Sequence, residues 1–287
     1  MNIISKFIQK TSSIPKIYNN FGFDGLLFSI LRNIGFKIKY QSIIDKKKEN
    51  LEKKIIIKTH KTIIDGPYRN TTLNCNSNWH GYDWSSKLLG CYEQQVQDKI
   101  VNIKKTYKLK NIINFGGGDG YHIIGLVKNN FFEKGLVFEI DEKSKKFLSE
   151  NIDLNNLNSK ISVETQANFK TIEKYFDKNE MNESLYLIDI EGEEYNLINK
   201  KNLKYYSKSI LIIEDHHFLI NDKSKKKEFL ENLNENFNVE ILKNSSRNPF
   251  KHSLMDELND DERWLLMSEG RDRNMNWLVC IPKKPIN

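Results

Sequence analysis

The chain has 287 residues, of which 38% are hydrophobic and 29% charged, and its formal net charge is +7. This length and hydrophobic content suffice to bury one large α/β core plus an extension, and they exclude an intrinsically disordered chain. The three cysteines are an odd number without Cys-x-x-Cys spacing. They argue against a zinc cluster and favour a reducing, cytoplasmic compartment.

The first part of the chain is basic. Residues 1–61 carry 13 Lys or Arg against four acids, which leaves the remainder slightly acidic. We expect residues 1–60 to form a basic amphipathic helical arm, because Met1–Lys10 places Ile and Phe side chains on one helical face with Lys opposite. A second apolar segment covers Phe21–Phe36, and a Lys-rich linker covers Asp45–Lys54.

Two interpretations of this arm remain open. Neither apolar stretch reaches the roughly 18 to 20 uninterrupted apolar residues that span a bilayer. No small-residue cleavage site follows a short apolar core, so we expect no secretory signal. The arm either packs as a helical cap or homodimer contact, which we favour, or lies on an anionic membrane surface as a peripheral anchor.

Residues 61–107 read as a lead-in that forms the lip of a substrate site. Lys54–Gly66 is expected to form one or two short strands, and Lys87–Lys104 a helix. Between them, the loop Thr71–Ser85 is rich in amides and aromatic rings: Asn74, Asn76, Trp79, His80, Gly81, Tyr82 and Trp84. Such a loop suits a polyhydroxylated substrate, because rings stack on sugar faces while amides bind hydroxyls. It is equally well read as a surface loop whose tryptophans anchor the arm.

The segment 111–141 contains the most informative pattern of the chain. Ile112 and Ile113 indicate a buried strand, a glycine-rich turn follows, and Tyr121–Val127 restarts as a helix. Leu136–Phe138 forms the next strand, and Glu139 closes it. An acid at this point is placed to accept two hydrogen bonds from a ribose diol. The segment therefore predicts a cofactor that contains adenosine.

The glycine spacing restricts which cofactor binds. The dinucleotide pattern G-x-G-x-x-G fails in both reading frames, and no Gly-Lys-Ser/Thr follows for a phosphate loop. The pattern present is G-x-G-x-G, which resembles motif I of S-adenosylmethionine (SAM) methyltransferases. One departure is Asn114, which stands where those enzymes commonly carry an acid that faces the SAM ammonium. We assign the cofactor contacts to Phe115, Gly116, Gly118, Gly120, Tyr121, Glu139, Ile140 and Asp189.

Two further strands end in charged residues. The strand within Ser184–Ile198 presents Asp189 and Glu191 at its carboxyl end, and the strand within Ser209–Leu219 ends in Glu214, Asp215, His216 and His217. Ligands of open α/β sheets bind at the carboxyl ends of the strands. We therefore expect these side chains to meet at one edge of the sheet.

This succession resembles the FkbM-type SAM-dependent methyltransferases. Their Asp-x-Glu-Gly-x-Glu signature stands here as Asp189, Glu191, Gly192 and Glu194, and their later acid and His as Glu214 and His216. The resemblance covers about residues 108–281 and extends weakly upstream, where it brings Tyr92 and Glu93 toward the acceptor pocket. It implies a Rossmann-like class I SAM methyltransferase domain at 108–287, with a mostly parallel seven-stranded sheet, an antiparallel edge strand and an N-terminal helical extension.

The resemblance implies transfer of a methyl group from SAM to a hydroxyl. An alcohol needs a base near neutral pH, and His216 is our first choice because its unperturbed pKa near 6.5 leaves it largely neutral. Asp189 lies near the SAM methyl group or orients the acceptor, and Glu191 orients the substrate or the loop. We assign no metal ligands. A divalent cation held by the His and the acids is the less favoured alternative.

Charge and motifs restrict the acceptor. The catalytic part is not basic, no Asn/Asp-Pro-Pro-Tyr/Phe follows the fourth strand, and no Pro-Cys nucleophile is present, so we do not expect a nucleic-acid partner. We predict a carbohydrate or other polyhydroxylated metabolite, as in polysaccharide biosynthesis. A non-catalytic SAM-fold module in a biosynthetic complex and a methyltransferase for protein or nucleic acid are the alternatives.

Overall fold

The computed structural model describes residues 22, 23, 25, 27, 43–76, 83–271 and 273–283. The chain forms two compact units, residues 1–49 and 50–287, and the division falls within helix α3 (Ile43–Lys58). In the first unit, the described residues 22, 23, 25 and 27 are helical. The expected helix of residues 1–10 and most of the apolar segment 21–36 lie outside the described residues. The division at residues 60 and 107 stays a prediction.

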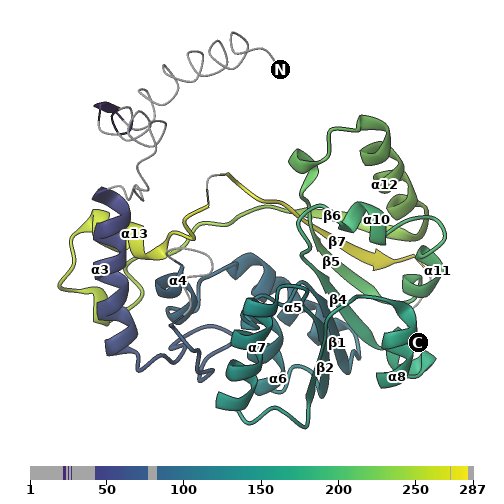
Figure 1. Ribbon diagram of the computed structural model, residues 1–287, viewed down its shortest axis with the longest axis horizontal. Helices are drawn as coiled ribbons and strands as arrows, with labels where there is room; N and C mark the ends of the chain where they lie inside the picture. The colour runs from purple at the N-terminus through teal and green to yellow at the C-terminus, as the bar shows by residue number, and fades with distance from the viewer. Residues whose placement is uncertain are drawn as a thin grey trace. The chain divides into compact units, whose positions relative to one another are not determined.

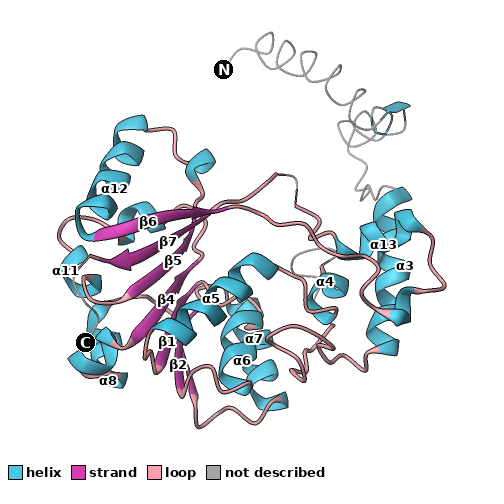
Figure 2. Ribbon diagram, turned by 180° about the vertical axis from the view of Figure 1, so that it is seen from behind, coloured by secondary structure: helices cyan, strands magenta, loops and turns pink. Residues whose placement is uncertain are grey.

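The second unit is built on a seven-stranded sheet with the strand order β3-β2-β1-β4-β5-β7-β6 (Figure 2). Strand β7 runs antiparallel to both β5 and β6, while the other neighbouring pairs are parallel. The reversed strand thus belongs to the β6–β7 pair at one edge of the sheet, and the predicted fold class is confirmed. The strands are β1 (Asn111–Phe115), β2 (Lys134–Phe138), β3 (Ile161–Glu164), β4 (Ser184–Ile188), β5 (Ile210–Glu214), β6 (Phe237–Leu242) and β7 (Trp277–Pro282).

Helices cover both faces of this sheet (Figure 1). One face packs on helices α5 (Gln94–Thr106), α6 (Tyr121–Lys128) and α7 (Glu142–Leu154). The opposite face packs on α8 (Phe169–Tyr175), α10 (Glu194–Leu197), α11 (Leu203–Tyr206) and α12 (Lys223–Asn236). The remaining helices are α4 (Trp84–Leu88), α9 (Lys178–Asn182), α13 (Asp260–Met267) and the short 3₁₀ turns η1 (His217–Leu219) and η2 (Ser253–Met255).

The apolar strands read as continuous runs because both faces are buried. Ile112 packs into the core on the α5–α7 face, and its neighbour Ile113 packs into the core on the α8–α12 face. At the end of β4, Leu187 likewise packs into the core on the α5–α7 face and Ile188 into the core on the α8–α12 face. Successive side chains alternate between the faces of a strand, so each apolar run supplies both cores at once.

The lead-in differs from the sequence prediction in two places. The expected linker and strand over residues 45–66 are wrong, because α3 runs through to Lys58 and only an isolated bridge between Thr62 and Thr72 follows. Lys and Leu are good helix formers, and Leu51 and Ile55 pack one turn apart into a core shared with α4 and α13. The expected helix over 87–104 is interrupted between α4 and α5.

The order of the strands in the sheet reverses at β1, although β1 and its neighbours β2 and β4 are all parallel. β2 and β3 follow β1 on one side, while β4 lies on the other side of β1. The loops that follow β1 and β4 diverge at such a point, and ligands of open α/β sheets bind in the crevice between them. No helix within the described parts of the chain is long and apolar enough to cross a membrane. The three cysteines are free thiols.

Candidate functional site

The loop after β1 carries the glycines predicted to lie under a cofactor. Gly116, Gly118 and Gly120 have φ angles of +79°, +53° and +87°. A Cβ on Gly116 would lie 1.7 Å from the carbonyl oxygen of Asp189, so this position tolerates only glycine. A Cβ on Gly118, in contrast, would meet no heavy atom within 4 Å. The loop is therefore packed against the end of β4 on one side and open at Gly118.

Glu139 stands directly beside this opening. Its Oε2 accepts a hydrogen bond from the Gly118 N–H at 2.7 Å, and its Oε1 accepts one from the Asp141 N–H at 2.8 Å. The next residue, Ile140, is 74% exposed although its side chain is apolar. The end of β2 thus presents a carboxylate held by backbone amides next to an uncovered apolar side chain.

Asn114 is buried where the related motif carries an acid. Its Nδ2 lies 3.3 to 3.4 Å from the carbonyl oxygens of Phe115, Gly116 and Leu187. The amide therefore serves as a donor to the backbone of β4 and of the glycine loop. A carboxylate cannot donate these bonds, so the Asn side chain stabilises this loop conformation.

Two predicted cofactor contacts have buried side chains. The Phe115 ring stacks on Phe138 at 5.1 Å within the core, which leaves only its backbone for a ligand. Tyr121 is 3% exposed, and its hydroxyl oxygen lies 3.0 Å from Nε2 of Gln97. Side-chain contacts of these two residues with a cofactor are therefore not supported, because packing in the sheet core orients both rings.

Glu194 joins the loop after β4 to the loop after β5. Its side chain is fully buried, and its Oε2 accepts a hydrogen bond from the Gly192 N–H at 2.8 Å. Its Oε1 accepts from the backbone N–H of His216 at 3.0 Å and lies 3.2 Å from His216 Nδ1. Because Nδ1 is engaged, the other ring nitrogen, Nε2, points toward the remaining acids of the signature.

Three carboxylates face that nitrogen. His216 Nε2 lies 3.3 Å from Oε2 of Glu214, 3.5 Å from Oε2 of Glu191 and 3.6 Å from Oδ1 of Asp189. Glu191 has a φ angle of +51°, an unusual conformation for a residue with a side chain. The structure thus brings together all three residues that the sequence assigned to catalysis.

The charges of this cluster alter the expected protonation of His216. Burial acts against its protonated form, but the hydrogen bonds of Glu194 and Glu214 and the charge of Asp189 outweigh burial and raise the pKa of His216 to about 10. The expectation that His216 is largely neutral at pH 7 is therefore wrong for the protein alone. The sequence did not show that four acids would surround one imidazole.

The pKa values of Asp189 and Glu214 are shifted in opposite directions. Burial and the neighbouring Glu214 raise the pKa of Asp189 well above its ordinary value. Burial also opposes ionisation of Glu214, but His216 and Arg271 outweigh it and lower the pKa of Glu214 to about 2. Glu214 is therefore the member of the pair that carries the negative charge.

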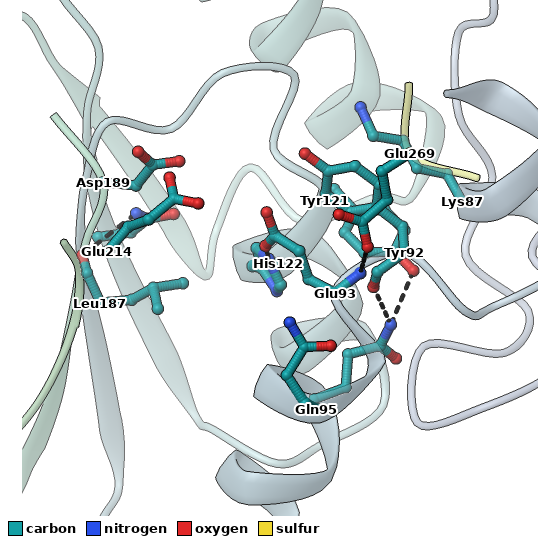
Figure 3. Close-up of polar contacts among 12 residues, drawn as sticks. Lys87, Tyr92, Glu93, Gln95, Tyr121, His122, Leu187, Asp189, Glu214 and Glu269 are labelled. Atoms are coloured by element: carbon teal, nitrogen blue, oxygen red, sulfur yellow. Dashed lines mark hydrogen bonds and ion pairs between the residues drawn. The ribbon is translucent and has the colours of Figure 1, made fainter. Parts of the chain in front are cut away.

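Arg271 connects this cluster to the lead-in. Its guanidinium binds Glu214 Oε1 at 2.5 Å and Glu269 Oε2 at 2.9 Å, and it also forms an ion pair with Glu93. In Figure 3, Glu93 and Glu269 lie across the site from Asp189 and Glu214. Sequence reasoning missed Arg271 and Glu269. The charged run that contains them, before the last strand, was the only available signal.

Glu93 was expected near the acceptor. In the structure it lies close to Glu269, on the side of the site opposite Asp189 and Glu214 (Figure 3). Its Oε2 lies 2.5 Å from His122 Nε2, and His122 Nδ1 lies 2.8 Å from the hydroxyl of Tyr68. Tyr92 lies beside it, with its hydroxyl 3.2 Å from Arg271 Nη2. Both ring nitrogens of His122 are engaged, so His122 holds the lead-in against α6 and is not a free base.

Lys87, from the lead-in, forms an ion pair with an acid of the glycine loop. Its Nζ lies 2.6 Å from Oδ2 of Asp119 and 2.9 Å from Oδ2 of Asp83, and all three residues are buried. Asp119 is the single acid within the glycine run. A buried ammonium between two carboxylates is strongly destabilised when one partner is removed, so Lys87 acts as a positioning residue for the loop.

The predicted substrate lip is described only in part. Trp79, His80, Gly81 and Tyr82 lie outside the described residues. Trp84 is buried at the start of α4, and the Asn74 side chain donates to Glu150 at 2.6 Å. The role of this loop in binding a sugar stays a prediction.

No family model and no curated protein matches the chain. Among solved structures, an O-methyltransferase from Bacillus cereus in complex with SAH is 12% identical, covers 89% of this chain and 97% of its own, and has a TM-score of 0.45. An uncharacterized protein from Listeria monocytogenes serotype 4b is 13% identical, with coverages of 66% and 69% and a TM-score of 0.41. TrmK from M. capricolum in complex with SAH is 15% identical, with coverages of 64% and 67% and a TM-score of 0.38.

Proposed function

We propose that this chain is a SAM-dependent methyltransferase of the FkbM type, which methylates a hydroxyl of a carbohydrate or other polyhydroxylated metabolite. The observation that carries the proposal is the arrangement at the carboxyl ends of β1 and β4, where the strand order of the sheet reverses. There, the glycine loop is open at Gly118 beside Glu139, and the cluster of Asp189, Glu191 and His216 stands at the ends of β4 and β5.

The residues beside the glycine loop fit an adenosine group. Glu139 is held by two amides, and a carboxylate offers about four acceptor positions, so it retains capacity for the two hydroxyls of a ribose. The exposed Ile140 supplies an apolar surface for an adenine ring. SAM supplies an electrophilic methyl group on a sulfonium. The protein then has to align the acceptor and remove its proton.

The cluster at the ends of β4 and β5 suits a hydroxyl acceptor. In the protein alone, His216 is protonated and orients the carboxylates, so the proton of the acceptor goes to a carboxylate. The Glu191 side chain is 76% exposed and is placed to pass that proton to solvent. We assign Asp189 to orienting the acceptor. It directly follows β4 and lies beside the glycine loop, where its backbone N–H donates a hydrogen bond to the Phe115 carbonyl at 2.9 Å.

The charge of the site favours a small neutral acceptor over a nucleic acid. Acidic side chains from both sides line it, namely Asp189, Glu191 and Glu214 at the strand ends and Glu93 and Glu269 opposite. A nucleic-acid methyltransferase has to neutralise phosphates with Lys and Arg around its active site. Here Arg271 is already engaged by three of these acids.

Calorimetric titration with SAM and with S-adenosylhomocysteine tests the proposal. We expect micromolar binding that is lost in Glu139→Ala and retained in Glu173→Ala, which removes an exposed acid on α8. Retained affinity in Glu139→Ala would contradict the ribose assignment. If the wild type does not bind, the enzyme proposal fails, and the neutral Asn114 then favours a non-catalytic module.

A further inference from the structure

The ends of β4 and β5 direct three donor atoms at one point. One ligand atom from each of Asp189, Glu214 and His216 lies within 4.8 Å of the other two. We propose that these three side chains bind one divalent metal ion, of the kind that accepts both carboxylate and imidazole ligands. The inference rests on the proposed function only for the role that the ion would have in catalysis. The ion itself can be detected independently of SAM.

The spacing of the donor atoms matches a shared ion. Donor atoms at about 2.0 to 2.2 Å from one metal, separated by angles between 90° and 110°, lie roughly 2.8 to 3.6 Å apart. His216 Nε2 lies 3.3 Å from Glu214 Oε2 and 3.6 Å from Asp189 Oδ1. A charge-assisted hydrogen bond between these groups would be about 2.7 to 2.9 Å long. The separations therefore fit donors around one ion, which would take the place of the long contact between His216 and Glu214.

Two of the three ligands have their other polar atom held elsewhere. His216 Nδ1 is engaged by the fully buried Glu194, and Glu214 Oε1 is bound by Arg271 at 2.5 Å. Metal-binding histidines commonly have the second ring nitrogen bound to a carboxylate, which fixes the ring and its tautomer. These contacts leave Nε2 of His216 and Oε2 of Glu214, which lie 3.3 Å apart, as the atoms that these two side chains can offer to an ion.

One buried oxygen of the cluster lacks the hydrogen-bond partner that buried polar atoms normally have. Asp189 Oδ1 is buried and forms no hydrogen bond with any described residue. The His216 side chain is 2% exposed, and its Nε2 has only the three long carboxylate contacts within the described structure. Buried polar atoms without partners are rare in native proteins and point to a missing water or ion.

The chemistry of the donors narrows the kind of metal. Carboxylates suit Mg²⁺, Ca²⁺ and Mn²⁺, whereas imidazole suits later transition metals. A site with two carboxylates and one imidazole therefore fits Mn²⁺ or Zn²⁺ better than Mg²⁺ or Ca²⁺. The Asp189 side chain is 36% exposed, which leaves the ion a route to solvent and to an acceptor oxygen. An ion at this place would fix the acceptor hydroxyl and lower its pKa.

The test is a titration of the full chain with Mn²⁺ in the absence of SAM. Binding is measured as the decrease of the free Mn²⁺ signal in electron paramagnetic resonance. We expect one ion per chain. Asp189→Asn and Glu214→Gln should each weaken binding by about tenfold or more. Glu193→Gln is the matched control, since this exposed acid lies in the same turn and its carboxylate accepts a hydrogen bond from the Asn196 side chain at 2.7 Å. Circular dichroism of each variant separates loss of a ligand from loss of the fold.

Two results would overturn the inference. One is no stoichiometric binding of Mn²⁺ or Zn²⁺ by the wild type, which would leave His216 and Arg271 to neutralise the carboxylates of the cluster. The other is equal binding by the wild type and both ligand variants, which would place the ion elsewhere. The SAM titration is independent of this experiment. If the protein binds SAM but no metal, only the metal site is refuted. If it binds metal but not SAM, only the proposed function is refuted.

Discussion

The two sides of the site are built from different chemical groups. The side formed by the ends of β1 and β2 consists of backbone amides, glycines and one carboxylate, and Glu139 there has both oxygens bound to N–H groups. The side formed by the ends of β4 and β5 consists of acidic and basic side chains, and Asp189 Oδ1 there has no hydrogen-bond partner among the described residues. The first side, the proposed cradle for the cofactor, thus has both oxygens of its carboxylate bound, whereas the second side has a buried oxygen without a hydrogen bond.

The largest expected effect concerns the cradle. Gly116→Ala should destabilise the protein by about 3 to 5 kcal/mol, because the new Cβ would collide with the Asp189 carbonyl and the φ angle of +79° is unfavourable. Gly118→Ala is the matched variant, and we expect it to cost only about 1 to 2 kcal/mol while it abolishes SAM binding. Urea unfolding and SAM titration of both variants measure this. Equal stability of the two would contradict the packing described for Gly116.

Removal of the acid that joins the two charged loops should have the next largest effect. Glu194→Ala leaves the Gly192 N–H and two nitrogens of His216 without their acceptor, and we expect a loss of about 3 kcal/mol. Glu193→Ala, at an exposed position one residue earlier, should change stability by no more than about 0.5 kcal/mol. Thermal unfolding of both variants decides whether Glu194 is structural. A small effect of Glu194→Ala would show that it is not.

The pH dependence of stability should reveal the charged cluster. The pKa of His216 is raised above its unfolded value of about 6.5, so its contribution is complete below pH 6.5 and is lost as the pH rises toward 10. The raised pKa of Asp189 acts in the same direction, while the lowered pKa of Glu214 adds stability that is lost below about pH 4.5. Without metal, we expect a fall of at least about 1.4 kcal/mol between pH 6.5 and 9.

Two variants check the origin of that fall. His216→Gln should flatten the decline of stability with pH. His217→Gln should not, because the His217 side chain is 42% exposed and binds only the neighbouring Asp215 at 3.1 Å. Urea unfolding in EDTA at several pH values provides the comparison. An unchanged slope in His216→Gln would mean that other groups cause the pH dependence.

The smallest expected effect concerns the exposed apolar residue of the cradle. Ile140→Ser should weaken SAM binding by about 1 kcal/mol, because the adenine would lose an apolar surface, and should leave stability nearly unchanged. Ile241→Ser removes a similarly exposed side chain from strand β6 and should leave SAM affinity unaltered. Calorimetry of both variants distinguishes them. Equal affinity in Ile140→Ser would place the adenine elsewhere.

Much of the fold could be predicted because its signals are local. The apolar runs of the strands and the glycines at Gly116, Gly118 and Gly120 are readable from neighbouring residues. The prediction failed over residues 45–66, where an Ile-rich end of α3 resembles a strand. Only the packing of Leu51 and Ile55 against α4 and α13 selects the helix. A short apolar run does not distinguish the two by itself.

The sequence by itself determined the ligand edge of the sheet, since the glycine turn, Glu139, Asp189 and His216 each follow a recognisable strand. Only the tertiary structure decided the electrostatics of that edge. Glu93 and Glu269 join it through Arg271, and four carboxylates converge on one buried imidazole. The pKa of a side chain depends on burial and on charges a few ångströms away, and these neighbours come from segments distant in the chain.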